Sequence, residues 1–295
     1  MQRKLLPPAP LPRDPAWILG LWRSGTTALH DALCAASDLA TPRTWQCMAP
    51  ASFAITGRPR TAARQPRPMD DLVIGTDSPQ EDEFAWLLLG GDSAYRAFLD
   101  PSRLPELAAT LDPRRWRTRP WPAEDRWRTF LGQVGAQDGR GRRLLLKSPN
   151  HTFRALGLLD RFPNSSFVWI TREPDAIVRS NLKMWRSMIE LYALRPLPPA
   201  LLEDFIGQAL AQAAGVLDAL REICPREQLV VVRQEDLLAD PDPLVRGVLS
   251  RWNATGTCAP PAFTGTPPEA TTAPSGAVQD LLRRAQQRAL ASHGL

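Results

Sequence analysis

The sequence predicts an α/β fold of three layers, in which a central parallel sheet is flanked by helices. Short apolar runs alternate with helical patterns along the chain, which is typical of such sheets. The 295 residues suffice for a large core, and 43% apolar with 23% charged residues is the composition of an ordinary globular protein. This composition excludes a collagen-like chain and a wholly disordered one.

The first elements are predicted from apolar runs and loop signals. Residues 16–21 form a short apolar run between loop signals, which indicates a buried strand, and 26–36 continue as a helix. A strand is expected over 71–75 and a helix over 80–89. Acidic residues begin the second helix, as the dipole at a helix N-terminus favours.

The second half of the chain repeats this alternation. Strands are expected over 143–147, 166–170 and 229–232, and helices over 152–161, 175–192, 200–223 and 243–252. Pro174 suits the first turn of the helix that follows the 166–170 strand. Ligands of parallel sheets bind beyond the carboxyl ends of the strands, so the functional residues are expected there.

Proline is unusually frequent, with 30 residues, and it marks the expected loops. These loops are 1–15, 58–70, 112–122, 195–199 and 259–274. We expect a single domain over 1–295 with a core of about 14–255. A flexible loop is expected over 256–276, rich in Pro, Thr, Ala and Gly, and a C-terminal helix over 277–291.

Charge and cysteine content narrow the function classes. The net charge of +5 suits a polyanionic small ligand, and Arg outnumbers Lys, which favours phosphate-type recognition. No nucleic-acid partner is expected, because the Arg residues are dispersed and no binding motif is present. The four cysteines lie far apart and the histidines number three, so neither a disulfide scaffold nor a common zinc site is expected.

Neither a membrane segment nor a signal peptide is expected. No apolar run reaches the roughly 18 residues of a spanning helix. Prolines follow Arg3 and Lys4 where a signal peptide needs an apolar helix. The sequence therefore predicts a cytoplasmic protein.

The first expected strand runs into Gly20-Leu-Trp-Arg-Ser-Gly-Thr-Thr27, which is close to the phosphate-loop pattern GxxxxGK[ST]. Gly20 and Gly25 have its glycine spacing, and Thr27 holds its hydroxyl position. Thr26 stands where a nucleotide-binding loop carries lysine. This departure weakens the case for a nucleotide hydrolase that uses magnesium.

The geometry of an anion cradle survives this change. Backbone N–H groups of 23–27 would point at an anion at a helix N-terminus, and Arg23 supplies a positive charge. The alternative is a plain strand-to-helix turn with Ser24 as its cap.

A second anion site is predicted after the third strand of the parallel set. Arg172 lies at the carboxyl end of this strand, and Ser180 follows eight residues later in the next helix. A guanidinium and a hydroxyl so placed can converge on one phosphate. The alternative is an Arg172 that pairs with Glu173 or Asp175 at the surface.

These motifs together resemble those of the sulfotransferases that use 3′-phosphoadenosine 5′-phosphosulfate (PAPS). Trp22-Arg-Ser-Gly-Thr-Thr27 resembles their 5′-phosphosulfate loop, PKSGTT, and Arg172 with Ser180 matches their 3′-phosphate motif. Leu146-Lys147-Ser148-Pro149 resembles the LKS segment of the tyrosylprotein and bacterial branches. Gln234-Glu-Asp-Leu-Leu-Ala-Asp-Pro241 resembles YEDL…P, with Gln234 in place of tyrosine. Order and spacing agree over roughly 14–255.

The resemblance implies a P-loop-like fold and in-line transfer of a sulfuryl group from PAPS to a hydroxyl or amine acceptor, with 3′,5′-ADP as product and no metal. It implies that Lys147 stabilises the bridging oxygen or the moving sulfuryl group, and that Arg172 and Ser180 hold the 3′-phosphate. The residues implied to hold the 5′-phosphosulfate are Arg23, Ser24, Gly25, Thr26 and Thr27.

The general base has three candidates. A Glu at a corresponding helix start is the base in the tyrosylprotein branch, which implies Glu81 or Glu83, with Glu81 preferred. His151 is the other candidate, because an imidazole titrates near neutrality. The family's cytosolic members carry their His two residues after the lysine, where this chain has Pro149, and His151 also suits a local packing role.

The acceptor and the partners are less defined by the sequence. A small molecule or a peptide is the expected acceptor, and a homodimer stays open. Trp86, Tyr95 and Phe98 are candidates for an aromatic wall, although aromatic residues at helical spacing more often belong to a core. Two other functions stay open: a P-loop small-molecule kinase and a catalytically inactive nucleotide-binding module.

Overall fold

A parallel sheet of four strands, in the order β4-β1-β5-β6, forms the centre of the molecule. The computed structural model describes residues 11, 14–60, 64–67, 73–118, 120–137, 141–254 and 256. The strands of the sheet are β1 (Ala16–Leu19), β4 (Leu145–Lys147), β5 (Ser166–Thr171) and β6 (Leu229–Arg233).

Strand register brings the functional segments to one edge of this sheet. β1 lies between β4 and β5, and Ile18 of β1 stands opposite Lys147 on one side and Val168 on the other. Since all three strands are parallel, their carboxyl ends meet at the same edge. The segments that follow Leu19, Lys147 and Thr171 are therefore neighbours.

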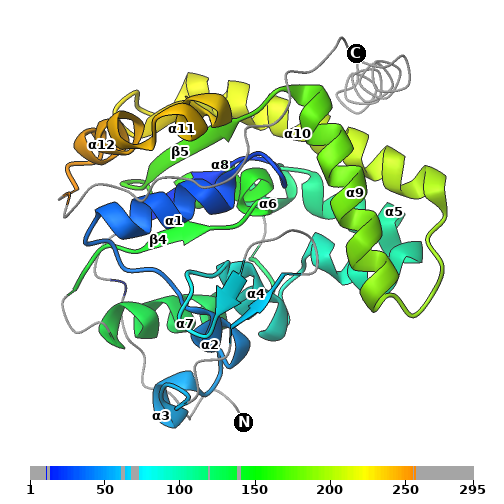
Figure 1. Cartoon of the computed structure of the whole chain (residues 1–295), viewed down its shortest axis with the longest axis horizontal. Helices are drawn as coiled ribbons and strands as arrows, with labels where there is room; N and C mark the ends of the chain where they lie inside the picture. Colours follow the sequence, from blue (N-terminus) through cyan, green and yellow to red (C-terminus); the bar gives the residue numbers. More distant parts are fainter. Residues whose placement is uncertain are drawn as a thin grey trace.

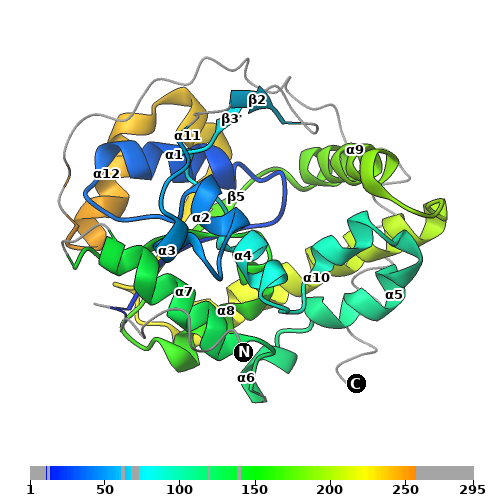
Figure 2. The ribbon, with the colours of Figure 1, turned by 90° about the horizontal axis from the view of Figure 1, so that it is seen from below.

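The two faces of the sheet are buried under different helices. Ala16 and Ile18 pack with α1 (Thr26–Ala36) and α12 (Pro241–Arg251), which lie next to each other (Figures 1 and 2). Trp17 and Leu19 point to the opposite face, as neighbours in a strand do. There they pack in the cluster that includes α8 (His151–Arg161), α9 (Pro174–Tyr192) and α10 (Pro199–Ile223).

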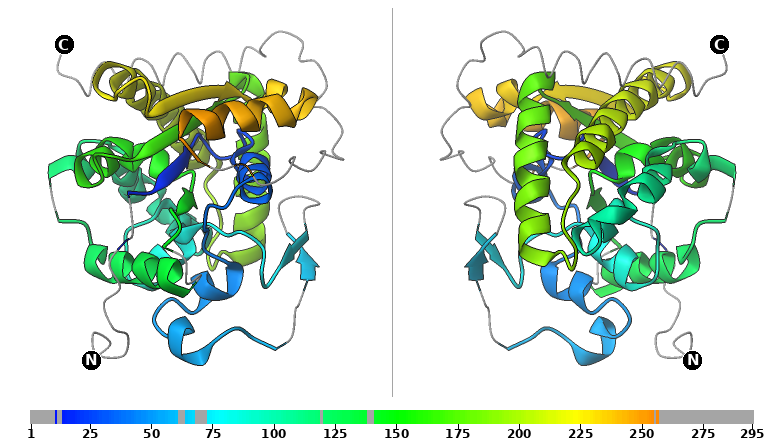
Figure 3. Two further views of the ribbon diagram at one scale, coloured as in Figure 1. Left: turned by 90° about the vertical axis from the view of Figure 1, so that its left-hand side faces the viewer. Right: turned by 90° about the vertical axis from the view of Figure 1, so that its right-hand side faces the viewer.

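The segment between α1 and β4 forms a further layer of short elements. Its α-helices are α2 (Thr44–Met48), α3 (Phe53–Thr56), α4 (Asp82–Leu88), α5 (Leu104–Leu107), α6 (Arg115–Thr118) and α7 (Glu124–Gln137). Its 3₁₀ helices are η2 (Ala94–Phe98), η3 (Pro101–Arg103) and η4 (Ala108–Leu111). Strands β2 (Arg64–Pro66) and β3 (Val73–Gly75) form an antiparallel pair at the periphery (Figure 3).

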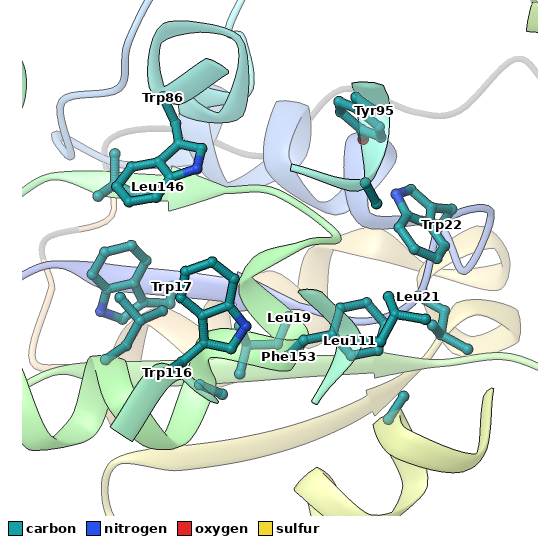
Figure 4. Packing of buried hydrophobic residues seen from close by; sticks show 14 of the residues in the cluster. Trp17, Leu19, Leu21, Trp22, Trp86, Tyr95, Leu111, Trp116, Leu146 and Phe153 are labelled. Carbon is teal, nitrogen blue, oxygen red and sulfur yellow. The ribbon is translucent and has the colours of Figure 1, made fainter. Parts of the chain in front are cut away.

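Tryptophans join this layer to the sheet. Trp86 of α4 packs against Trp116, Trp121 and Trp127, with ring centroids 6.3, 6.1 and 5.7 Å away. Figure 4 shows Trp17, Trp86 and Trp116 in this core. The indole N–H of Trp116 donates to Thr110 O at 2.9 Å, which satisfies a buried donor. Trp116, Trp121 and Trp127 are thus part of the core.

The predicted class and the strands and helices of the parallel sheet are present, with end shifts of a few residues. Three expectations were wrong in detail. The 71–75 strand belongs to the outlying antiparallel pair, because three residues with an exposed face cannot enter a buried sheet. The 112–122 loop contains α6, and the 58–70 loop contains β2. The structure also adds α11 (Gln234–Ala239) directly after β6.

The predicted loop over 256–276 lies outside the described residues except for Gly256, and the helix over 277–291 lies wholly outside them. Within the part of the chain that the structure describes, we find no helix with the length and apolar character that a membrane crossing requires. The single-domain prediction over 1–295 is not tested by these observations and stays a prediction.

Candidate active site

The loop after β1 requires glycine at two positions. Gly20 has φ 143°, and a Cβ there would lie 2.7 Å from the carbonyl oxygen of Ile170 and from Ser24 Oγ. Gly25 has φ 98° and is the N-cap of α1. Thr152 of α8 bonds both the N–H and the C=O of Gly20 through its hydroxyl, at 2.9 Å each. The loop is therefore fixed against β5 and α8.

Ser24 closes the turn of this loop. Its hydroxyl donates to Leu21 O at 2.7 Å and its backbone N–H donates to the same oxygen at 3.1 Å. It does not cap α1, so the alternative of a serine-capped turn is not what the structure contains. Helix α1 has neither a side-chain cap nor an acidic residue in its first turn. Its first N–H groups and the positive end of its dipole are thus available to an anion.

Arg23, Arg172 and Ser180 come together beside this loop. Arg23 Nε donates to Ser180 Oγ at 3.0 Å, and Arg172 Nη1 donates to the carbonyl oxygen of Arg23 at 2.9 Å. Arg172 Nε is buried with no hydrogen-bond partner among the described residues. Burial, and then the guanidinium of Arg23, lowers the pKa of Arg172. Two neighbouring cations with an unsatisfied donor are an arrangement that an anion stabilises.

Lys147 connects the loop with a carboxylate. Its ammonium donates to Glu81 Oε1 at 2.8 Å and to Thr27 Oγ1 at 3.2 Å. The hydroxyl of Tyr95 donates to Glu81 Oε2 at 2.8 Å. Lys147 is 3% and Glu81 11% exposed as side chains, so the pair is well shielded from water. Thr27, Lys147, Glu81 and Tyr95 thus form one continuous hydrogen-bonded chain.

The start of α4 presents Glu81 because the next two acids are held in the core. Asp82 accepts hydrogen bonds from Trp127 Nε1 at 2.9 Å and contacts His151 Nε2 at 2.9 Å. Glu83 forms a two-pronged ion pair with Arg154, at 2.5 and 2.9 Å. The three successive acids therefore have three different partners, and only Glu81 is directed to the loop.

The three candidates for the base are consequently not equivalent. Glu81 lines the largest of the cavities near the loop, described below, whereas Glu83 and His151 do not. His151 is 1% exposed and its ring packs edge-on against Trp17, with centroids 5.1 Å apart. The structure brings Glu81 to Lys147 and places the other two in the core. His151 has the packing role that the sequence left open.

A cavity of about 770 Å³ opens beside the loop and reaches Glu81. Thr26, Thr27 and Arg23 contribute to its lining. Its apolar and aromatic lining residues are Trp22, Ile74, Phe84, Leu87, Leu88, Tyr95, Phe98, Leu99, Pro149, Met184, Met188 and Tyr192. Its other polar lining residues are Arg67, Gln80, Arg96, Asp100 and Arg103. Tyr95 and Phe98 are thus part of the wall, while Trp86 belongs to the core. The cavity thus offers room for a molecule next to the carboxylate of Glu81 and the loop after β1.

The family of this chain follows from comparison with known proteins. A model of the sulfotransferase family matches residues 15–254, which include every element of the site. The chain belongs to the sulfotransferase family. This is a family of transferase enzymes and implies a sulfonate donor. The kinase alternative loses its support accordingly.

Two curated relatives of this sulfotransferase carry the same name, omega-hydroxy-beta-dihydromenaquinone-9 sulfotransferase Stf3, and come from Mycobacterium bovis and Mycobacterium tuberculosis. Each is 30% identical over 239 residues, which cover 79% of this chain and 61% of the relative. The chain thus spans about three fifths of the length of these relatives.

Solved structures support the fold. The crystal structure of sulfotransferase STF1 from M. tuberculosis is similar with a TM-score of 0.60 and 20% identity, covering 96% of this chain and 74% of that one. Sulfotransferase STF9 from Mycobacterium avium gives 0.54 and 18%, covering 97% and 70%. The P-loop-like α/β class with a central parallel sheet is therefore confirmed.

Sequence reasoning missed three parts of the site. The hydrogen bond from Tyr95 in η2 to Glu81 joins residues 14 positions apart, on either side of α4, and no local pattern predicts it. The pairs of Asp82 with His151 and of Glu83 with Arg154 were also missed. The run of three acids gave no signal of these partners, because the dipole at a helix N-terminus is enough to explain it.

Proposed function

We propose that this sulfotransferase moves a sulfuryl group from PAPS to a hydroxyl acceptor, with Glu81 as general base and Lys147 as the catalytic cation. One observation carries the proposal. Lys147 contacts both Thr27 of the anion loop and Glu81 at the cavity wall, so donor cradle and base share one cation. An amine acceptor is compatible with the same arrangement.

The residues fit a donor with two anionic ends. The uncapped N-terminus of α1, with Thr26 and Thr27, suits the 5′-phosphosulfate. The unsatisfied Nε of Arg172, together with Arg23 and Ser180, suits a second phosphate at the 3′ position. A donor that lacks the 3′-phosphate leaves the two guanidinium groups without an anion between them.

When PAPS is bound, it supplies the sulfur atom that is attacked, with 3′,5′-ADP as the leaving group. Glu81 accepts the proton of the acceptor hydroxyl while the acceptor oxygen bonds to sulfur. The S–O bond to the 5′-phosphate breaks, and its electron pair stays on the phosphate oxygen. Lys147 and the N-terminus of α1 stabilise the charge that grows there. Atoms and charge balance without a further reactant.

The role of Lys147 also accounts for the missing lysine of the loop. In this chain the cation comes from β4, a neighbouring strand, while Thr26 holds the position in α1. The ammonium reaches Thr27 from outside the loop at 3.2 Å. A positive charge is thus supplied to the same place by another element.

Isothermal titration tests the donor class. We expect 3′,5′-ADP to bind without metal, and 5′-AMP to bind at least about tenfold more weakly. Arg172→Ala should weaken 3′,5′-ADP about 10- to 100-fold, the worth of a charged hydrogen bond, and change 5′-AMP little. Arg186→Ala is the matched control, because Arg186 is an exposed arginine of α9 outside the cluster.

Transfer of radiolabelled sulfate from PAPS to an acceptor completes the test. Equal affinity for both nucleotides would contradict the assignment of Arg172 and Ser180. Preference for Mg-ATP would restore the kinase alternative, and 3′,5′-ADP binding without any transfer would indicate an inactive module.

The remaining expectations stay predictions from the sequence. These are a cytoplasmic location and the lack of a nucleic-acid partner, while a homodimer in solution stays open. A peptide acceptor also remains within the proposal as long as it offers a hydroxyl.

A further inference from the structure

We infer that the acceptor is an alcohol or phenol carried on a large, uncharged apolar body, which fills the 770 Å³ cavity with its hydroxyl at Glu81. This inference rests on the proposed function, since it assigns the acceptor of that same site. The cavity wall selects this class of molecule. It is apolar over most of its surface and polar at its inner end, so it matches an acceptor with an apolar body and one hydroxyl.

The cavity has a polar inner end, a largely apolar wall, and a mouth where exposed apolar side chains lie beside charged ones. Glu81 and Thr26 are 8% and 4% exposed, so they lie deep. Leu88, Leu99 and Tyr192 also line the cavity but are 59, 55 and 45% exposed, so they mark its mouth. An acceptor that reaches the base must therefore pass along apolar side chains from the surface inwards. Apart from the charged side chains near the mouth, only the leading end of such a molecule meets polar groups.

The wall between these ends is apolar as well. Met184 and Met188 stand one helical turn apart on α9 and both line the cavity, as do Phe84 and Phe98 from α4 and η2. Thioether side chains adapt their shape to irregular apolar ligands. Aromatic and methionine walls stabilise a ligand through buried apolar area, with no directional requirement.

Charged side chains near the mouth are already engaged within the protein. Arg96 pairs with Asp92 at 3.4 Å, and Arg103 forms two bonds with Glu106, at 2.9 and 2.7 Å. The carboxylate of Asp100 accepts from the hydroxyl and N–H of Ser102. A charged or sugar-like acceptor would have to break these contacts or leave its own polar groups unsatisfied against the apolar wall. An uncharged apolar body does neither.

The test uses a series of phenols that share the same reacting hydroxyl and carry alkyl chains of increasing length. We would measure the affinity of 4-methylphenol, 4-butylphenol and 4-octylphenol for the protein saturated with 3′,5′-ADP, and kcat/KM for their sulfation by PAPS. Each added CH₂ that enters the cavity should raise both by about threefold. Glucose and a short tyrosine peptide serve as polar acceptors, and should be at least a hundredfold poorer in kcat/KM than 4-octylphenol.

Two surface variants test the place of binding. Leu99→Asn at the mouth should reduce the ratio of 4-octylphenol to 4-methylphenol affinity by about three- to tenfold. Leu191→Asn is the matched control, because Leu191 is an equally exposed leucine of α9, at 55%, that does not line the cavity. Unchanged 3′,5′-ADP affinity in both variants verifies that they are folded.

The outcomes separate the inference from the function on which it rests. Affinity that does not rise along the series, or a sugar or peptide that is sulfated better than 4-octylphenol, would overturn the inference while leaving sulfuryl transfer intact. A rising affinity without any transfer would support the apolar site and contradict the proposed function. An equal effect of Leu99→Asn and Leu191→Asn would also overturn the placement of the acceptor.

Discussion

The hydroxyl of Tyr95 donates to Oε2 of Glu81 at 2.8 Å, while Lys147 donates to Oε1 of the same carboxylate. The two bonds fix the carboxylate plane at the inner end of the cavity. Burial and the neighbouring Glu81 raise the pKa of Tyr95 well above its usual value, so the phenol stays protonated and remains a donor. Tyr95 is therefore a positioning residue for the proposed base.

Replacing Tyr95 tests this positioning role. In Tyr95→Phe the ring stays stacked on Phe98 but the hydrogen bond to Glu81 is lost. We expect kcat to fall about tenfold, with KM for PAPS unchanged, because a bond to a charged group is lost without loss of wall area. Steady-state kinetics measure both. Tyr192→Phe is the control, as it removes the hydroxyl of the chain's other tyrosine; equal kinetics in both variants would contradict the role.

If Glu81 is the base, replacing Glu81 should affect turnover, whereas replacing His151 should affect stability. Glu81→Gln keeps the hydrogen-bonding shape but removes the proton acceptor, so kcat should fall at least about a hundredfold. His151→Gln should keep kcat within about threefold and lower the free energy of unfolding by about 1–3 kcal/mol, because Asp82 loses a buried partner. Turnover per 3′,5′-ADP site and urea unfolding give the two quantities. Loss of turnover in the His151 variant alone would transfer the base to the imidazole.

If Lys147 is the catalytic cation, its replacement should lower kcat much more than it weakens donor binding. Lys147→Ala should lower kcat about a hundredfold or more, since charge on the leaving phosphate loses its stabilising partner. The Kd of 3′,5′-ADP should change by less than about tenfold, because α1 and the arginine cluster remain. Lys183→Ala, an exposed lysine of α9, is the control. If donor affinity collapses and kcat is retained, Lys147 serves only to bind the donor.

His30 predicts a pH dependence of stability that is separate from catalysis. It is buried in α1, and its Nε2 lies 2.8 Å from Thr41 Oγ1. Burial, and then Lys147 and Arg43, lowers the pKa of His30 well below 6.5. Above pH 6.5 the imidazole of His30 is neutral in both the folded and the unfolded protein. Below pH 6.5 it takes up a proton in the unfolded chain but stays neutral in the folded protein. Stability therefore falls as the pH falls, by up to about 1.4 kcal/mol per pH unit.

A glutamine at this position isolates the contribution of His30. His30→Gln keeps a group able to bond Thr41 but cannot titrate. Between pH 6.5 and 5 its free energy of unfolding, from urea melts, should decline less steeply than that of the wild type. Parallel curves for the two proteins would contradict a buried neutral His30.

The parts of the site that were predictable from the sequence are those that follow strand ends. Arg23, Lys147 and Arg172 each come directly after a short apolar run, and the carboxyl ends of parallel strands share one edge. Their proximity therefore follows from topology alone. Ser180 lies beside the same loop, where its hydroxyl accepts a hydrogen bond from Arg23. That Ser180 and Arg172 share one phosphate stays a prediction.

The parts that were not predictable depend on contacts between distant segments. Whether Glu81 or Glu83 faces the loop is decided by Arg154, which lies 71 residues beyond Glu83 and is held between Trp86 and Trp116. The same holds for Trp121, which packs against the distant Trp86 with ring centroids 6.1 Å apart and so brings an expected loop into the core. Three-residue strands such as β3 carry too little pattern to be assigned to a sheet.

The register of β1 against β4 has an evolutionary consequence. Ile18 is aligned with Lys147 by backbone hydrogen bonds, and Thr27 follows β1 through a fixed loop, so the distance between the loop and the cation does not depend on the 37–144 segment. That segment nonetheless supplies most residues of the cavity wall. Changes to wall residues of this segment other than Glu81 and Tyr95 can accordingly alter the acceptor, while the donor loop and its cation stay in place.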